Sequence, residues 1–277
     1  MVPTHILRYW RGGSPPQTRH YWESVGFNQA KETFVTQQLP FLNRMMRKFA
    51  INNAERQASF FGNAIQETIW LAAIREGNGP NLWYAPWFGR GFLQLTNPEN
   101  YINYWRWLGR EIPEALKTAL VHAYQQCSAA TPRTNAFLRD THFPELTPQM
   151  IAWRDAVGEA TAIDATGSAG FYWAKLSMAR YADQPHVLER VSVDATIGGV
   201  THTEIRCYYR SPAFWRNSAS VNLPGVINNL YSLALNGFAD RCCAYGQVLA
   251  VAGEYIFPST VNGVSFEFPE FVTPRRG

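Results

Sequence analysis

Two glutamates in this sequence, Glu67 and Glu76, have the residue type and spacing that acid–base chemistry requires. Glu67 falls within a helical pattern over 53–74, where Phe60 and Trp70 share its face. Aromatic neighbours partly desolvate a carboxyl group, and desolvation favours the protonated form that a general acid needs. We therefore predict that Glu67 is a proton donor.

Glu76 can work together with Glu67 only if the helix between them ends before it. In a continuous helix, nine residues would place the two carboxyl groups about 13 Å apart along the axis and on opposite sides. The run Gly77-Asn78-Gly79-Pro80 breaks helices and can turn Glu76 back toward Glu67. Carboxyl groups roughly 6.5–9.5 Å apart leave room for the water that an inverting glycosidase activates.

The segment 88–96, FGRGFLQLT, follows the two glutamates and supplies polar side chains for a cleft. Gln94 and Thr96 alternate with Leu93 and Leu95, so we expect the polar pair to share one face while the leucines pack away from it. A polar face of this kind can bind sugar hydroxyl and acetamide groups. The two glycines that flank the arginine let the backbone approach a ligand closely.

The elements that must position these residues are predominantly helical, because apolar residues recur at helical spacing along most of the chain. Asn52 or Asn53 is expected to cap the 53–74 helix, and Pro40 to begin an earlier one. Further helical patterns cover 98–108, 114–127, 147–153, 167–182, 185–196 and 202–209. We predict a mainly α, lysozyme-like domain with a two-lobed cleft. It spans 1–277 with a core over about 28–210, and 211–277 is either part of it or an added helical subdomain with an irregular tail.

The composition excludes several classes of function. The net charge is only +4, and Lys and Arg never form a run longer than two, which argues against nucleic acid and suits an acidic polymer such as a cell wall. The pI is near 8.9. No stretch approaches 18 apolar residues, so no membrane insertion is predicted. Aromatic residues make up 14% of the chain, and aromatic faces suit either core packing or stacking on pyranose rings.

The cysteines and histidines do not form a metal or thiol site. The four cysteines fit no zinc pattern and read as buried free thiols, or as one disulfide outside the cytoplasm. The six histidines include no HExxH pair, which argues against a zinc amidase. A Cys–His peptidase would need a cysteine at a helix start, and Cys127 stands late in its helical pattern. We therefore predict no metal and no cofactor.

Taken together, several motifs resemble glycoside hydrolase family 19, the chitinase and phage-endolysin group of the lysozyme superfamily. They are FFGNAIQETIW around Glu67, then Glu76, then FGRGFLQLTNPENY, then GSAGFYW at 167–173 and ATIGG at 195–199. The matches follow the family's order over about 60–210. Two positions depart from the family pattern: Gln66 stands where a His is usual, and Ile197 stands where an Asn is usual.

The resemblance implies a role for each matched residue. Glu67 would be the proton donor, Glu76 the base that activates water, and Thr96 a residue that helps to hold that water. The expected substrate-binding residues are Thr96, Gln94, Asn100, Tyr101, Arg90, Arg206 and Trp70. The implied reaction is hydrolysis of the β-1,4 bonds of peptidoglycan glycan strands.

The whole chain also resembles the C-terminal lysozyme domain of TseP-like type VI secretion effectors. That resemblance implies action in the periplasm or cell wall of a target bacterium, with a cognate immunity protein and secretion components as partners. The first residues show no signal peptide, since 1–10 lack an apolar stretch. Delivery would then depend on a secretion apparatus or on holin-like release.

Three other functions stay open on the sequence. A lytic transglycosylase would use Glu67 alone, with a hydroxyl of the sugar as nucleophile. A chitinase would use the same two carboxyl groups on a different polymer. A non-catalytic wall-binding module would have no need of a buried acid.

Overall fold

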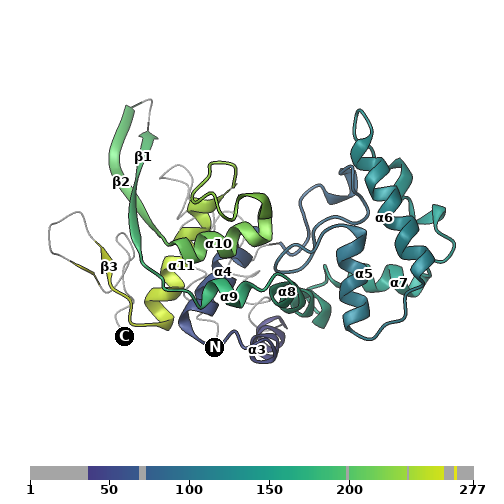
Figure 1. Cartoon of the computed structure of the whole chain (residues 1–277), viewed down its shortest axis with the longest axis horizontal. Coiled ribbons are helices and arrows are strands. Elements are labelled where there is room, and N and C mark those ends of the chain that lie inside the picture. The colour runs from purple at the N-terminus through teal and green to yellow at the C-terminus, as the bar shows by residue number, and fades with distance from the viewer. Residues whose placement is uncertain (1–36, 69–72, 198–199, 236, 259–264, 267–277) are drawn as a thin grey trace.

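The protein is described by a computed structural model that covers residues 37–68, 73–197, 200–235, 237–258 and 265–266. Over these residues the fold is mainly helical, with two antiparallel strand pairs, which confirms the prediction of a mainly α fold. Figure 1 shows one group of helices around α4, α10 and α11 and another around α5, α6 and α7.

The helices and strands have the following bounds. The helices are α3 (Leu39–Lys48), α4 (Ala54–Glu67), α5 (Pro98–Trp107), α6 (Glu114–Ala129), α7 (Pro148–Ala156), α8 (Ile163–Lys175), α9 (Met178–Ala182), α10 (Pro212–Asn222) and α11 (Phe238–Ala252). The strands are β1 (Glu189–Ile197), β2 (Val200–Arg210), β3 (Phe257–Pro258) and β4 (Ser265–Phe266).

Side-chain caps define where several helices begin. The Asn53 side chain accepts a hydrogen bond from the backbone N–H of Arg56 at 2.8 Å, so that Asn53 and not Asn52 caps α4. Asn97, Thr147 and Ser211 cap α5, α7 and α10 in the same way. A proline in the first turn follows each of these three caps. Proline is tolerated there because an N–H in the first turn would have no partner within the helix.

The first hydrophobic cluster is built on the packing of α4 against α11, and we call it the α4–α11 cluster. Its largest members are Phe60, Phe61, Trp173, Trp215 and Tyr245. Residues of α10 belong to the same cluster as those of α4, since the rings of Phe214 and Tyr245 stack at 4.1 Å. The helices of the 211–277 region therefore share a core with α4 and do not form a layer of their own.

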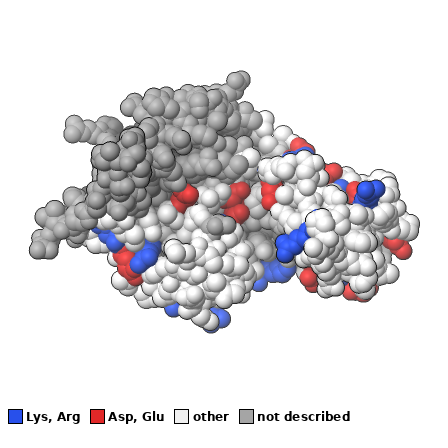
Figure 2. Space-filling view, turned by 90° about the horizontal axis from the view of Figure 1, so that it is seen from above, with Lys and Arg blue, Asp and Glu red and all other residues white. Residues whose placement is uncertain are grey.

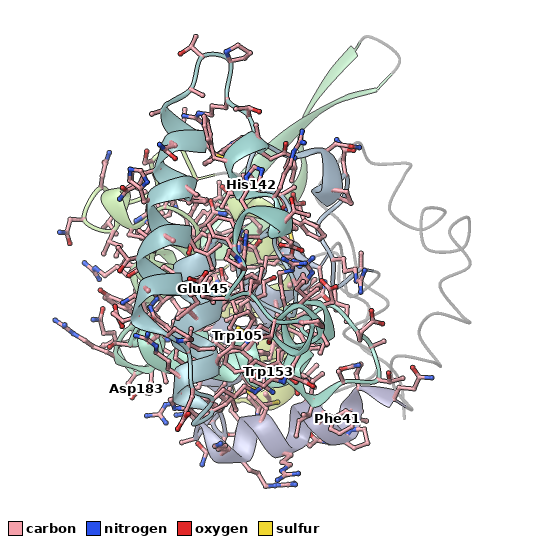
Figure 3. All side chains as sticks on the ribbon, turned by 90° about the vertical axis from the view of Figure 1, so that its right-hand side faces the viewer. Phe41, Trp105, His142, Glu145, Trp153 and Asp183 are labelled. Carbon is pink, nitrogen blue, oxygen red and sulfur yellow. The ribbon has the colours of Figure 1, made fainter. Side chains whose placement is uncertain are left out.

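The second hydrophobic cluster, the α5–α6 cluster, joins α5, α6 and α7. It includes Trp87, Tyr101, Trp105, Leu116 and Leu138. Figure 3 shows Trp105 of α5 beside Trp153 of α7, and their ring centroids lie 5.9 Å apart. Helix α8 contributes to both clusters, because Trp173 belongs to the first and Phe171 to the second.

Two predicted helices, 185–196 and 202–209, are wrong: these segments form the β1–β2 hairpin. Glu189 pairs with Arg210 at one end of the hairpin and Ile197 with Val200 at the other. The sequence of β1 alternates apolar and polar residues from Val191 onward, which is the period of a strand and not of a helix. Apolar and polar side chains that alternate in this way lie on opposite faces of a strand, which is why the segment pairs as a strand.

The predicted 53–74 helix ends earlier than expected, at Glu67. The hydroxyl of Thr68 donates to the carbonyl of Ala64 at 2.6 Å, and the Thr68 backbone N–H bonds the same carbonyl, so Thr68 closes the last turn. The predicted 167–182 helix is likewise divided into α8 and α9 at Ser177, whose φ is +51°. All four cysteines are buried free thiols.

Candidate active site

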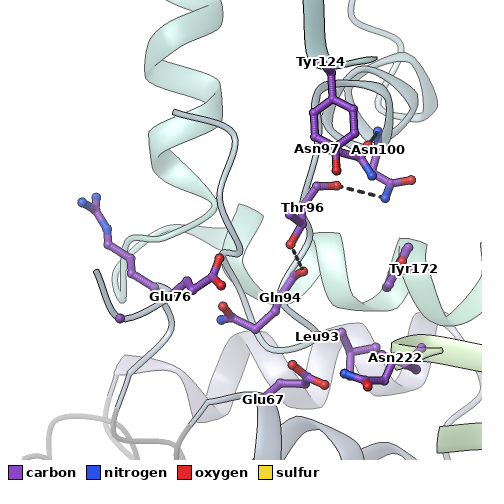
Figure 4. Close-up of a pocket in the computed structure, with 13 residues that line it drawn as sticks. Glu67, Glu76, Leu93, Gln94, Thr96, Asn97, Asn100, Tyr124, Tyr172 and Asn222 are labelled. Atoms are coloured by element: carbon purple, nitrogen blue, oxygen red, sulfur yellow. Dashed lines mark hydrogen bonds between the residues drawn. The ribbon is translucent and has the colours of Figure 1, made fainter. Parts of the chain in front are cut away.

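A pocket of about 520 Å³ brings both predicted glutamates together. It is bordered by the end of α4, by α6, α8 and α10, and by parts of the 75–100 segment. Its lining residues are Glu67, Arg75, Glu76, Gly77, Leu93, Gln94, Thr96, Asn97, Asn100, Tyr124, Tyr172, Val221 and Asn222. Figure 4 shows Glu67 and Glu76 entering the pocket from different segments, with Gln94 between them in this view.

Glu67, the last residue of α4, is held by Arg241 of α11. The Arg241 guanidinium donates from Nη2 to Glu67 Oε1 at 2.5 Å. The Arg241 side chain is 2% exposed and the Glu67 side chain 16% exposed, so this ion pair is largely removed from water. Among the described residues only Oε1 is engaged in this way, so Oε2 is the oxygen that has both lone pairs left for a ligand.

A buried polar network holds Arg241 in place. Its Nη1 donates to Asn63 Oδ1 at 2.8 Å, and Asn63 Nδ2 donates to Asn217 Oδ1 at 3.1 Å. Asn217 in turn donates to the carbonyl of Met178 at 2.8 Å. Three helices and the start of a fourth thus fix the guanidinium, which fixes the orientation of the Glu67 carboxyl group.

Glu76 reaches the pocket through backbone pairing between two short segments. The N–H of Glu76 donates to the carbonyl of Gly89 at 2.9 Å, and the N–H of Gly91 donates to the carbonyl of Ile74 at 2.8 Å. This pairing places Glu76 directly beside the glycine-arginine-glycine motif. The prediction that the helix ends before Glu76 is confirmed.

The Glu76 carboxyl group accepts one hydrogen bond at each oxygen. The hydroxyl of Tyr84 donates to Oε1 at 2.7 Å, and the backbone N–H of Gly89 donates to Oε2 at 2.8 Å. Burial raises the pKa of Tyr84 well above its ordinary value, and the neighbouring Glu76 raises it further, so this hydroxyl stays a donor.

Gly89 leaves the space in which Glu76 and Gln94 meet. A Cβ at this position would lie 2.5 Å from Gln94 Oε1 and 3.2 Å from Glu76 Oε2. Any larger residue would therefore push apart the two side chains that border the pocket here. The glycine here makes room for two side chains of the chain itself, whereas the sequence analysis expected it to make room for a ligand.

The floor of the pocket carries the predicted polar residues of the 88–96 segment. Gln94 and Thr96 line the pocket and Leu95 is buried away from it, as the alternation predicts, but Leu93 also borders the pocket, which the alternation does not predict. The segment is a turn and not a strand, since Gln94 has φ +48°. The Thr96 hydroxyl donates to the Gln94 carbonyl at 2.8 Å, which keeps its lone pairs available as acceptors toward the pocket.

Asn100 is a further predicted residue that lines the pocket. Its Nδ2 donates to the carbonyl of Thr96 at 3.0 Å, and its Oδ1 accepts from Lys175 at 2.5 Å. The Asn100 side chain therefore ties α5 to both the pocket floor and the end of α8.

Arg90 and Tyr101 were expected to bind substrate, and the structure buries both of them behind the pocket. Arg90 is 3% exposed and donates to the carbonyls of Pro86 and Phe88 and to the hydroxyl of Tyr101. Tyr101 is fully buried, and its hydroxyl donates to the Phe88 carbonyl at 2.9 Å. Arg90 also bonds Asp155 at 3.2 Å, so these two side chains tie the loop backbone to α7 and hold its shape.

The two remaining predicted residues are not placed in the pocket. Trp70 lies outside the described residues. Arg206 lies in β2, paired with Val193, and its side chain lies outside what the structure describes. Ile197, matched to the family's INGG segment, ends β1, and Figure 1 shows the β1–β2 hairpin extending away from α5 and α6.

Two residues that hold the glutamates, Tyr84 and Arg241, were not predicted. Arg241 stands in α11, FADRCCAYGQVLAVA, where it is the one basic residue of a largely apolar helix. A lone arginine in such a pattern requires a buried partner, and this signal was available in the sequence. Tyr84 stands among several aromatic residues, and no spacing distinguishes it from its neighbours.

The described pocket has an acidic character. Two glutamates face it, while its one basic lining residue, Arg75, is paired with Glu159 and bonded to the carbonyl of Gly158. Figure 2 shows acidic side chains near the middle of the molecule, between the parts formed by α10 and α11 and by α5 and α6. Within the described ranges, no three His, Cys, Asp or Glu side chains gather as a metal site requires.

None of the described helices has the length and apolar character needed to cross a membrane. When the chain is compared with protein-family models, with curated proteins and with solved structures, none of the three comparisons finds a match.

Proposed function

We propose that this chain is a peptidoglycan hydrolase of the muramidase or lysozyme type, which cleaves the β-1,4 bonds of glycan strands. The observation that carries the proposal is the presence of Glu67 and Glu76 in one pocket, each oriented from behind by dedicated hydrogen-bond donors. Most glycoside hydrolases catalyse their reaction with a pair of carboxyl groups in a cavity large enough for a sugar ring.

In the proposed reaction Glu67 is the general acid. It gives a proton from Oε2 to the glycosidic oxygen as the bond to the leaving sugar breaks. Arg241 then stabilises the carboxylate that remains, because the charge-assisted bond to Oε1 strengthens as negative charge develops.

Glu76 is the general base of the proposed reaction. As a carboxylate held at both oxygens by Tyr84 and Gly89, it can still accept a proton from a water on a remaining lone pair. That water attacks the anomeric carbon on the face opposite the leaving group, so the configuration inverts. Thr96 would help to orient the water through the acceptor side of its hydroxyl.

The biological setting follows from the resemblance to family 19 hydrolases and to secreted lysozyme effectors. We propose that the protein is an antibacterial effector or endolysin that acts on the wall of a target bacterium. A producing cell would then need a cognate immunity protein, and delivery would need a secretion apparatus or holin-like release.

The decisive experiment is digestion of purified sacculi followed by mass spectrometry of the soluble fragments. Reducing-end muropeptides are expected, and proton NMR of fresh products should show the α-anomer that inversion of a β bond produces. Anhydro-muramyl ends would identify a lytic transglycosylase that uses Glu67 alone. A sample that releases no soluble fragments would refute the proposal in favour of a binding module.

A further inference from the structure

Helix α6 reaches the pocket through one aromatic side chain, Tyr124. This half-buried residue lines the pocket together with Asn97 and Asn100. Figure 4 shows the Tyr124 ring beside these two asparagines, at the end of the pocket away from Glu67 and Asn222. The part of the Tyr124 side chain that lines the pocket can contact a ligand that extends beyond the two glutamates.

The Tyr124 ring is held in position by its neighbours. Trp83 packs against it with ring centroids 5.2 Å apart and planes at 41°. The Arg133 guanidinium lies 5.2 Å from the Trp83 ring, and the edge of Tyr84 packs on Trp83 at 5.0 Å. Because Trp83 is fixed from two other sides, Tyr124 has little freedom to turn away, and a preorganised surface binds at a lower entropic cost.

Polar groups next to the ring select the kind of ligand. Asn97 uses Oδ1 to cap α5, at 2.9 Å from the N–H of Asn100, and no residue in the described part of the chain accepts from its Nδ2, which can donate to a ligand. The glutamates at the other end of the pocket disfavour phosphate or carboxylate groups there. A flat apolar face, an amide donor and an acidic pocket together fit a neutral ring that carries hydroxyl or acetamide acceptors.

We propose that Tyr124 is the platform of a separate sugar subsite, which binds a neutral N-acetylated pyranose ring of a glycan strand through its apolar face. The proposal rests on the proposed function, because the ring belongs to the strand that the glutamates cleave. In this proposal α6 helps to bind the glycan strand and takes no part in the hydrolysis step. Loss of the ring should therefore weaken binding and leave the chemical step intact.

The test measures binding of a soluble N-acetylglucosamine tetramer by calorimetry to the full chain carrying Glu67→Gln. Adding Tyr124→Ala should raise the dissociation constant of the tetramer by about ten-fold. Tyr124→Phe retains the ring and should stay within about two-fold of the parent. In the chain with an intact Glu67, Tyr124→Ala should raise KM for solubilised glycan strands by a similar factor and change kcat little.

Tyr181→Ala is the matched control. Tyr181 is a half-buried tyrosine outside the described pocket, with Arg180 lying 6.0 Å from its ring, and its removal should leave tetramer binding unchanged. A parent that fails to bind the tetramer, or a Tyr124→Ala variant that binds as tightly as the parent, overturns the subsite. If Tyr124→Phe and Tyr124→Ala lose the same amount of tetramer affinity, the ring does not bind by stacking. If the tetramer binds in a Tyr124-dependent way but the chain with an intact Glu67 releases no muropeptides, the hydrolase proposal is refuted and the subsite is retained.

Discussion

The two glutamates are held by partners of different chemistry. Glu67 is bonded to a buried charged guanidinium, and Glu76 to a phenol and a backbone amide. Replacing Glu67 therefore removes both the proposed proton donor and the partner of a buried guanidinium, while replacing Glu76 disturbs only neutral donors. This difference sets what each substitution should do.

Glu67→Gln should reduce the rate of sacculus lysis by about 10²-fold or more, because the amide has no proton to give. The Gln oxygen can still accept from Arg241, but the buried guanidinium loses its counter-charge, so we expect a loss of about 2–4 kcal/mol in the free energy of unfolding. Lysis rates are to be compared at a temperature where thermal denaturation shows both proteins folded. A variant that lyses at a near wild-type rate would show that Glu67 is not the acid.

Glu76→Gln should cost at least about ten-fold in rate, roughly 1.4 kcal/mol of barrier, and less than Glu67→Gln. The amide cannot take the proton of the attacking water, yet bulk water can attack more slowly without a base. Mass spectrometry of the residual products should still show reducing ends. Full activity together with anhydro ends would instead support the transglycosylase mechanism.

Tyr84→Phe removes one of the two donors that orient Glu76. We expect kcat to fall by about three- to ten-fold with little change in KM, the range for losing one oriented hydrogen bond. Tyr255→Phe is the matched control, because the Tyr255 hydroxyl donates to Glu55 in the same way outside the described pocket. Equal activity of Tyr84→Phe and wild type would mean that Gly89 alone suffices to hold Glu76.

At the scale of elements, the segment 74–97 determines the site more than any helix does. Its backbone pairs with itself at Glu76 and Gly89, and the buried Arg90 binds it together from behind. Helix α4 contributes only its last residue to the pocket. Changes that widen this loop should therefore affect activity more than stability.

Gly89→Ala tests this point directly. The new methyl group would overlap the Gln94 amide and press on the Glu76 carboxyl group, so lysis should fall by more than ten-fold, with a stability loss of about 1–3 kcal/mol. Gly225→Ala meets no atom within 4 Å and should behave as wild type in both assays. Activity that survives in Gly89→Ala would show that the loop adapts without moving Glu76.

The sequence predicted the helices α5, α6 and α7 closely, because their apolar spacing and their capping or proline signals agree. It missed the β1–β2 hairpin, although Val191, Val193 and Ala195 alternate with polar residues and two glycines separate the strands. At the site, Glu67, Glu76 and Gln94 were found from local spacing. Arg241 was not, since a contact across 174 positions depends on how α4 and α11 pack.

At the scale of the whole molecule, charge is distributed unevenly. The chain has a net charge of +4, whereas the described pocket is acidic. A basic exterior attracts a polymer with many carboxylates, and an acidic pocket admits its neutral sugar rings. Peptidoglycan combines both properties, since carboxylates lie on its peptide stems and not on the sugar backbone.

We therefore expect the protein to release soluble fragments faster from sacculi than from colloidal chitin, which lacks carboxylates. The preference should shrink as salt is raised from about 0.05 to 0.5 M, because surface attraction is screened. Product release from both polymers can be followed by a reducing-sugar assay. Equal or faster chitin turnover at low salt would contradict the assignment of peptidoglycan as substrate.

The pairing of Glu67 with Arg241 also has a consequence for biosynthesis. At ordinary rates of translation, the 174 positions between them take on the order of ten to thirty seconds to make. Throughout that interval the emerging chain has the acid but neither its guanidinium nor helix α11, against which the apolar face of α4 packs. If Glu67 acts as proposed, a chain that stalls before residue 238 lacks the guanidinium that orients the acid, and it should release no soluble fragments from sacculi.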